Sequence, residues 1–114
     1  MIHYLIKVVL KLYKDDEFIA TMRKLSDKIR KEEDCARFEL YRDVEKDYAF
    51  TMMGVWKSRE GMEKHFQNYN YKIMVGAAKV LGESFEMKIA EQLDKDGLEL
   101  VRELSKPKSE LDTG

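Results

Sequence analysis

The sequence contains few of the residues that bind metal ions, form disulfides or interrupt secondary structure. Its 114 residues include one cysteine, one proline and two histidines. The single cysteine, Cys35, cannot form an internal disulfide, which fits a reducing compartment and leads us to expect a cytoplasmic protein. Neither histidine, His3 or His65, has a cysteine or a carboxylate at the spacing of a zinc site, so we predict no metal site.

An excess of one charge, long apolar runs and glycine-rich loops are also absent. The 21 lysine and arginine residues nearly balance the 22 aspartate and glutamate residues, so the charge gives no reason to expect binding to nucleic acid or to an anionic membrane. No apolar run approaches the ~20 residues of a membrane span, and the first residues lead directly into a strand-like run without a signal peptide. Without a glycine-rich phosphate loop we expect no nucleotide, and we expect no other cofactor.

Periodic apolar residues divide residues 1–93 into four strands and two helical regions. Even-numbered residues from Ile2 to Leu12 share one face of a strand, and apolar residues from Phe18 to Ile29 recur at helical spacing. We predict strands over residues 2–12, 35–42, 48–56 and 84–93, a helix over residues 15–31, and a helical region over residues 59–81 that Asn68 and Asn70 interrupt. The glycine that follows, Gly82, is expected to cap the last helix in the left-handed conformation.

This order of elements predicts an α+β domain with the ferredoxin-like β-α-β-β-α-β arrangement and a four-stranded antiparallel sheet. The first and third strands are central in that arrangement, and both are apolar on two faces. Helices can cover only one face, so we expect a second copy to cover the other and predict a homodimer packed sheet to sheet. Residues 94–114 form an extension, in which we predict a short helix within residues 98–104 and then a loose tail.

The segment from Trp56 to Phe66 joins a strand to a helix and contains the only tryptophan. Ser58 is placed to cap the helix, because its hydroxyl can accept a hydrogen bond from the first turn. His65 lies on the apolar face of this helix and is expected to point into a pocket floored by Trp56. A histidine there can take or give a proton near neutral pH. Equally, it can be a buried neutral imidazole bonded to the backbone or to water.

Several neighbouring side chains also allow two interpretations. Phe50 and Trp56 can stack on a planar aromatic ligand or simply belong to the core. Asn68 and Tyr69 can orient a ligand or satisfy exposed helix ends. Cys35 follows three acidic residues, which raise the pKa of a thiol rather than activate it, so we interpret this cysteine as structural.

Three groups of residues resemble the antibiotic biosynthesis monooxygenase (ABM) family: the run Glu39–Asp43, the run Trp56–Ser58, and Met62 with His65 and Phe66. The resemblance covers roughly residues 1–93. It implies a dimeric α+β barrel with a pocket between helices and sheet in each subunit. The family's activities include cofactor-free oxygenation of quinols and anthrones, haem degradation, and isomerisation of a small phosphorylated signal.

Departures from the family pattern reduce the number of activities that we expect for this chain. Anthrone-oxidising members have an asparagine and a tyrosine where this chain has Met52 and Met62. Haem-degrading members have a tryptophan where His65 stands, so the resemblance disfavours haem. His65 itself matches the histidine of the quinol-oxidising members.

The sequence therefore leads us to predict a cofactor-independent monooxygenase that acts on a small aromatic quinol or phenol, with His65 as the base. The predicted substrate-binding residues are Trp56, Phe50, Met52, Met62, Phe66, Asn68 and Tyr69. The main alternative is a dimeric small-molecule-binding protein or isomerase without oxygen chemistry, which the two methionines favour because they make the pocket less polar. A purely structural dimer module, without a cavity beside the histidine, is the third possibility.

Overall fold

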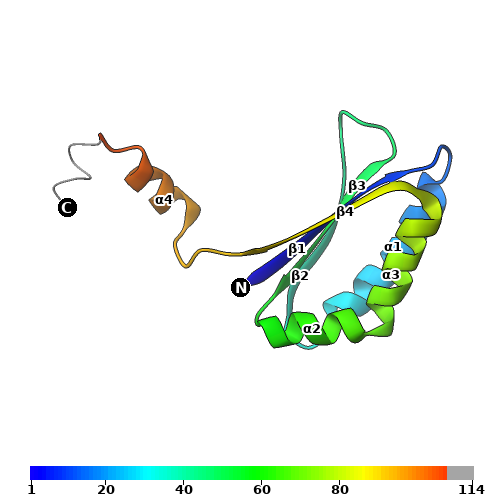
Figure 1. Ribbon diagram of the computed structural model, residues 1–114, viewed down its shortest axis with the longest axis horizontal. Coiled ribbons are helices and arrows are strands. Elements are labelled where there is room, and N and C mark those ends of the chain that lie inside the picture. The colour runs from blue at the N-terminus through cyan, green and yellow to red at the C-terminus, as the bar shows by residue number, and fades with distance from the viewer. Residues whose placement is uncertain (108–114) are drawn as a thin grey trace.

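The computed structural model describes residues 1–107, and the predicted loose tail over residues 108–114 lies outside them. Four strands and four helices follow one another within residues 1–107 (Figure 1). They are β1 (Ile2–Leu10), α1 (Asp15–Arg30), β2 (Cys35–Arg42), β3 (Ala49–Trp56), α2 (Arg59–Gln67), α3 (Tyr69–Leu81), β4 (Gly82–Glu91) and α4 (Gly97–Leu104). None of the helices within the described residues has the length and apolar character needed to cross a membrane.

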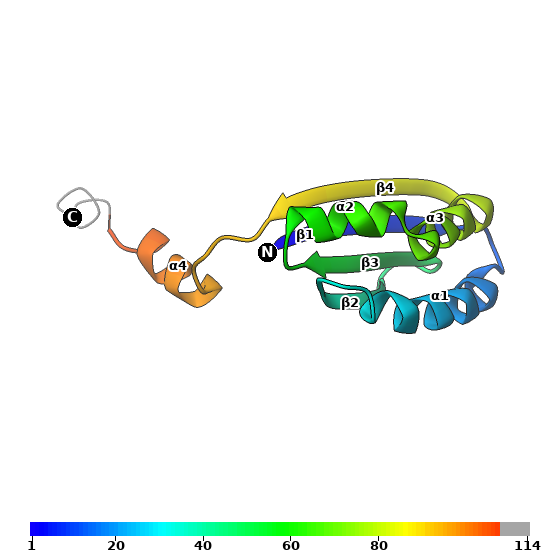
Figure 2. The same cartoon turned by 90° about the horizontal axis from the view of Figure 1, so that it is seen from below.

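The sheet has the strand order β2-β3-β1-β4, and each neighbouring pair is antiparallel. The first and third strands are therefore central, and the predicted α+β ferredoxin-like fold is confirmed. Helices α1, α2 and α3 all lie on one side of the sheet (Figures 1 and 2). They bury the even-numbered residues of β1, among them Tyr4, Ile6 and Val8, as strand periodicity requires. The same helices cover the even-numbered face of β3, from Phe50 to Trp56.

Helix α1 contributes its predicted apolar stripe to this core. Phe18, Met22, Leu25 and Ile29 are buried, and the first turn carries three acidic residues where the helix dipole favours negative charge. Helix α3 buries Met74, Ala78 and Leu81 against the same side of the sheet. Within residues 1–107 the domain therefore consists of one sheet and one layer of helices.

The ends of β1 and β4 differ from the prediction by two residues, and those of α1, β3 and α4 differ by one. The first strand stops at Leu10 rather than residue 12, because a turn begins there and Tyr13 adopts a φ of 64°. Gly82 does not cap α3 in the left-handed conformation: its φ of −96° and ψ of 151° make it the first residue of β4. Glycine is needed there for a different reason, since a Cβ atom would lie 2.3 Å from the carbonyl oxygen of Ala78. The last strand accordingly begins earlier and ends at Glu91.

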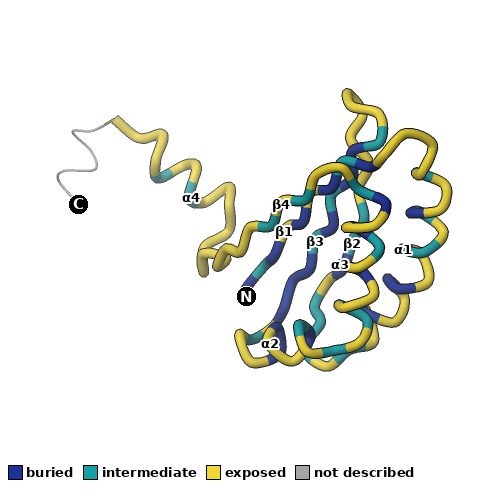
Figure 3. The backbone as a smooth tube through the Cα atoms, turned by 45° about the vertical axis from the view of Figure 1, so that its right-hand side comes forward, coloured by how far each residue is buried: buried dark blue, intermediate teal, exposed yellow. Residues whose placement is uncertain are grey.

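Two parts of the molecule remain uncovered. On the sheet face opposite the helices, Leu5 is 41% exposed and Met53, its partner on β3, is half-buried. Helix α4 projects away from the domain and buries none of its residues (Figure 3). Its exposed apolar residues include Leu98, Val101 and Leu104. The predicted short helix is thus present, but none of its residues is buried within the described part of the chain.

Candidate functional site

His65 lies on the buried face of α2 and is 1% exposed. The helix starts as predicted at Ser58, whose hydroxyl accepts a hydrogen bond from the amide of Gly61 over 3.0 Å. The imidazole stacks on the indole of Trp56, with ring centroids 4.3 Å apart and an interplanar angle of 28°. Helix α2 thus holds the histidine against Trp56, the last residue of β3, as the sequence predicts.

Both nitrogen atoms of His65 are hydrogen-bonded to other side chains. Its Nε2 atom lies 2.7 Å from the hydroxyl oxygen of Tyr4, and its Nδ1 atom lies 2.9 Å from a carboxylate oxygen of Glu32. The other oxygen of Glu32 accepts a bond from the Asn70 side-chain amide over 3.2 Å. A carboxylate can only accept, so Nδ1 carries the proton and Nε2 accepts the Tyr4 hydroxyl. The result is a chain of donors and acceptors from Tyr4 through His65 to Glu32.

The position of Glu32 depends on a tight loop between α1 and β2. Asp34 has a φ of 67°, its carboxylate accepts from the Ser58 hydroxyl over 2.8 Å, and its carbonyl oxygen accepts from the amide of Lys57 over 2.9 Å. Helix α2 can approach this loop because residue 61 is a glycine, where a Cβ atom would lie 2.4 Å from that of Asp34. The start of α2 and the loop that carries Glu32 are thereby fixed to one another.

The position of Tyr4 depends on the glycine opposite it in the sheet. Gly54 pairs with Tyr4 across β1 and β3, and a Cβ atom on Gly54 would lie 2.7 Å from the phenol ring. The missing side chain leaves space for the ring between the sheet and His65. The indole Nε1 of Trp56 lies next to the same space, where it is buried without a hydrogen-bond partner among residues 1–107. An unpaired buried donor costs roughly 1–3 kcal/mol, so this N–H is an unsatisfied polar group beside His65.

Burial sets the protonation states of the site. It lowers the pKa of His65, while the Glu32 carboxylate opposes this effect by its hydrogen bond and charge. Burial also raises the pKa of Tyr4 well above that of a free tyrosine, and Tyr71 and Glu32 raise it further. At neutral pH the imidazole is therefore neutral, and its unprotonated Nε2 faces a neutral phenol. The pKa of Cys35 is raised by burial and by Glu32, in agreement with the structural interpretation of that thiol.

Two further rings close the site on its outer side. Phe66 and Tyr71 are half-buried and lie 4.9 Å apart between ring centroids. Both contact Tyr4 and His65, at centroid distances between 5.3 and 6.4 Å. The Tyr71 hydroxyl reaches the sulfur of Met87 on β4 at 3.7 Å. Phe66 and Tyr71 thus separate the Tyr4–His65 pair from solvent.

The other predicted site residues are distributed over a wider area. Met52 is buried on β3, and Met62 is buried on the same face of α2 as His65. Asn68 accepts from the amide of Asn70 and so caps α3, while Tyr69 is 75% exposed. Phe50 lies six positions before Trp56 on β3, roughly 20 Å away at the usual rise per residue. The structure therefore brings Trp56, Met62 and Phe66 to His65 and leaves Phe50 and Tyr69 away from it.

Sequence reasoning missed the two hydrogen-bond partners of His65. Tyr4 was interpreted as one of the apolar residues of the first strand, and Glu32 as one of three acids before Cys35. One signal was available: a tyrosine among aliphatic residues on a central strand needs a partner for its hydroxyl when it is buried. The distance in sequence between residues 4, 32 and 65 gave no local spacing from which to find them.

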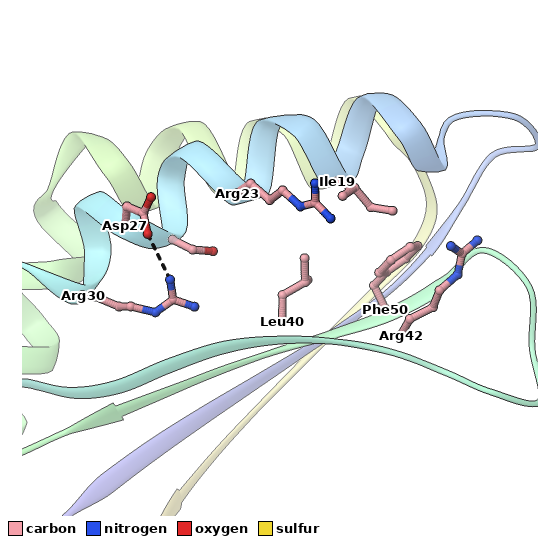
Figure 4. Close-up of a pocket in the computed structure, with 8 residues that line it drawn as sticks. Ile19, Arg23, Asp27, Arg30, Leu40, Arg42 and Phe50 are labelled. Carbon is pink, nitrogen blue, oxygen red and sulfur yellow. Dashed lines mark hydrogen bonds and ion pairs between the residues drawn. The ribbon is translucent and has the colours of Figure 1, made fainter.

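Two cavities matter for the assignment of function. One of about 240 Å³ lies beside His65 and is lined by Glu32, Glu33, Gly61, Lys64, His65 and Asn68. It opens on the Glu32 side of the imidazole, whereas the Trp56 side is filled by packed rings. A larger cavity of about 490 Å³ lies between α1 and the sheet (Figure 4).

The fold and the site together define a ferredoxin-like α+β domain that holds a buried histidine–tyrosine pair between helices and sheet. Residues 1–76 match the model of the antibiotic biosynthesis monooxygenase family, and the chain belongs to this family. An uncharacterized protein of Synechocystis is 30% identical over 77 residues, which are 67% of this chain and 52% of that relative. The chain thus spans about half the length of this curated relative.

Solved structures share the fold at lower identity. A conserved protein from Methanosarcina mazei is 22% identical, with a TM-score of 0.75 over 81% of this chain and 92% of its own. A mutant of SnoaB, described as a cofactor-independent oxygenase from Streptomyces nogalater, is 14% identical, with a TM-score of 0.70 over 83% of this chain and 97% of its own. At these identities the likeness shows the fold.

Proposed function

We propose that this protein is a cofactor-independent monooxygenase that acts on a small quinol or phenol. Membership of the family supports an oxygenase, as does the described activity of the Streptomyces nogalater neighbour. The observation that carries the proposal is the buried hydrogen-bonded chain from Tyr4 through His65 to Glu32. It provides a base in a site from which water is excluded.

The first step of the proposed reaction is removal of a proton from the substrate. A substrate hydroxyl placed against Tyr4 donates to its oxygen, while the Tyr4 proton passes to Nε2 of His65. Glu32 stabilises the imidazolium that forms, acting on the reaction through His65 as a positioning residue. General base catalysis of this kind contributes typically ~10²–10⁴-fold to the rate.

The electrons for oxygen reduction come from the substrate. A phenolate transfers electrons to dioxygen and forms a carbon–oxygen bond with one oxygen atom. The other oxygen atom leaves as water with two hydrogen atoms of the quinol, and the product is a hydroxyquinone. The balance is one quinol and one dioxygen to one hydroxyquinone and one water, so no further reductant is required.

Substrate access requires movement of the two outer rings. Phe66 and Tyr71 cover Tyr4 and His65, so their side chains must rotate to admit a substrate ring. The substrate would then stack against Trp56 and Met62, where the unpaired indole N–H can donate to an oxygen atom that gains negative charge.

Oxygen uptake with a panel of quinols tests the proposal. We expect wild-type protein to consume one dioxygen per quinol, and His65→Ala and Tyr4→Phe to lower kcat by about 10²-fold or more, as loss of a general base does. Tyr69→Phe is the matched control, because it removes the hydroxyl of an exposed tyrosine on the adjacent helix. The oxygenase proposal fails if wild-type protein consumes no oxygen above the spontaneous rate.

The closed state of the site favours a second candidate function. His65 is 1% exposed and bonded at both nitrogens, and Met52 and Met62 fill positions where a more polar site would carry donors. A dimeric binding protein or isomerase could use the same histidine to move a proton between two atoms of a ligand without oxygen. Native mass spectrometry of the purified protein, followed by turnover of any captured ligand under anaerobic conditions, distinguishes this function from the oxygenase.

We also propose that the protein is a homodimer, with the open sheet faces in contact. Leu5, Val9 and Met53 on the central strands give this face an apolar centre that a second copy would cover. A sheet-to-sheet contact of this kind buries on the order of 2,000 Å². Sedimentation at micromolar concentration should give the dimer mass, and a folded monomer there would overturn this assembly.

A further inference from the structure

The larger cavity lies between α1 and strands β2 and β3 (Figure 4). Side chains from α1 form its upper wall, and side chains from β2 and β3 form its lower wall. It is lined by Ile19, Arg23, Ser26, Asp27, Arg30, Leu40, Arg42 and Phe50. Its volume of about 490 Å³ falls in the usual range for small-molecule sites, roughly 300–1,000 Å³.

The base of the cavity is apolar. Ile19 and Leu40 are half-buried, because α1 does not close down on the edge strand at this point. Phe50 is 2% exposed and is held against Phe18, with ring centroids 5.2 Å apart. The hydroxyl of Ser26 already donates to the carbonyl oxygen of Met22, so it does not compete for a ligand. A flat apolar group could therefore lie on this base without burying an unpaired polar atom.

The rim of the cavity is cationic. The guanidinium of Arg30 is bonded to the Phe38 carbonyl oxygen and to Asp27. The guanidinium of Arg42 is paired with Asp15 and lies 5.2 Å from the centroid of the Phe50 ring. Arg23 has no hydrogen bond or ion pair among residues 1–107.

Asp27 and Asp15 neutralise Arg30 and Arg42. The one net positive charge at the rim is therefore that of Arg23. Arg23 lies next to the apolar base, and a guanidinium matches the two oxygens of a carboxylate.

We propose that this cavity binds a small organic carboxylate with a flat apolar body. The apolar body would lie on Ile19, Leu40 and Phe50, and the carboxylate would accept two hydrogen bonds from Arg23. This site is distinct from the proposed catalytic site, because Tyr4, His65 and Trp56 are not among its lining residues. Occupancy would bridge α1 to β2 and close the gap at the edge of the sheet.

The test is titration of the full-length protein with 2-naphthoate, followed by calorimetry and by amide chemical shifts. We expect binding with shifts confined to α1, β2 and the start of β3. The uncharged 2-naphthamide should bind at least about tenfold more weakly, because it lacks the charge that Arg23 recognises. Equal affinity for acid and amide, or no binding at millimolar concentration, would overturn the proposal.

Variants distinguish specific binding at this cavity from unspecific attraction of anions to the protein surface. Arg23→Gln should weaken 2-naphthoate binding at least about tenfold, whereas Arg102→Gln, the same change on the exposed helix α4, should leave it unchanged. Equal weakening by both variants would mean unspecific electrostatics. His65→Ala should have no effect, and loss of binding in that variant would place the ligand at the other site. Binding of 2-naphthyl phosphate but not of 2-naphthoate would reject the carboxylate as the ligand class.

Discussion

The two cavities on the helical side of the sheet differ in how their polar groups are satisfied. At His65 the side chains of Tyr4, His65 and Glu32 are bonded to one another, and an aromatic stack fills the space on the Trp56 side. Under α1 the charged groups lie at the exposed rim, and one of them has no partner in residues 1–107. A buried polar group has lost its hydration and is stabilised by a hydrogen-bond partner at fixed geometry. An exposed polar group stays hydrated until a ligand binds. The first arrangement suits proton transfer, and the second suits reversible binding.

The largest expected difference between the two regions is in stability. Trp56→Ala should lower the free energy of unfolding by about 3–5 kcal/mol, because it removes a fully buried ring and leaves a cavity beside His65. Leu40→Ala at the open cavity should cost about 1 kcal/mol, the typical value for a substitution. Urea unfolding followed by circular dichroism measures both. A cost below ~1 kcal/mol for Trp56→Ala would contradict the packed site.

A smaller change tests the space that Tyr4 occupies. Gly54→Ala should cost about 1–3 kcal/mol and displace the phenol from His65, because the new methyl group would lie 2.7 Å from the Tyr4 ring. Gly76→Ala is the matched control: a Cβ atom there meets nothing within 4 Å on the exposed side of α3, so it should stabilise by roughly 0.5–1 kcal/mol. If the two variants had equal stability, the close fit between β1 and β3 would be wrong.

The pH dependence of stability should report the burial of His65. Its pKa is lowered in the folded protein, so between that value and about 6.5 the unfolded chain binds more protons. Stability should therefore fall as the pH drops below about 6.5, and His65→Gln should remove this part of the dependence. Urea midpoints between pH 5 and pH 8 measure the effect. A wild-type protein that became more stable on acidification through this range, relative to the variant, would contradict the assignment.

The smallest effect is expected at the rim of the open cavity. Arg23→Gln should change the free energy of unfolding by less than about 0.5 kcal/mol, because this side chain is exposed and bonded to nothing in the described residues. The same unfolding assay applies. A loss above ~1 kcal/mol would mean that Arg23 supports the fold, and its proposed role in binding would then need another explanation.

The fold could be predicted from the sequence because its signals are local and repeated. Alternation in β1 and β3 identified the central strands, and Ser58 marked the start of α2. The partners of His65 could not be found in this way, because Tyr4 and Glu32 come from elements far apart in the chain. They meet only through the strand register and through the contact of Asp34 with Gly61. Phe50 was wrongly predicted to line the site with Trp56. The two residues share a face of β3, but Phe50 lies at the other end of the strand.

The most direct test of the central claim is the tautomer of His65 at neutral pH. We predict that the imidazole of His65 is neutral. Its proton lies on Nδ1, which is bonded to Glu32, and its unprotonated Nε2 accepts from Tyr4. Long-range proton–nitrogen correlation spectra of 15N-labelled protein distinguish the two ring nitrogens, and His65→Gln identifies the signals. Persistence of this pattern at pH 7, and its loss in Glu32→Gln, would support the Tyr4–His65–Glu32 chain as a base. A doubly protonated ring, or a proton on Nε2 instead of Nδ1, would contradict it.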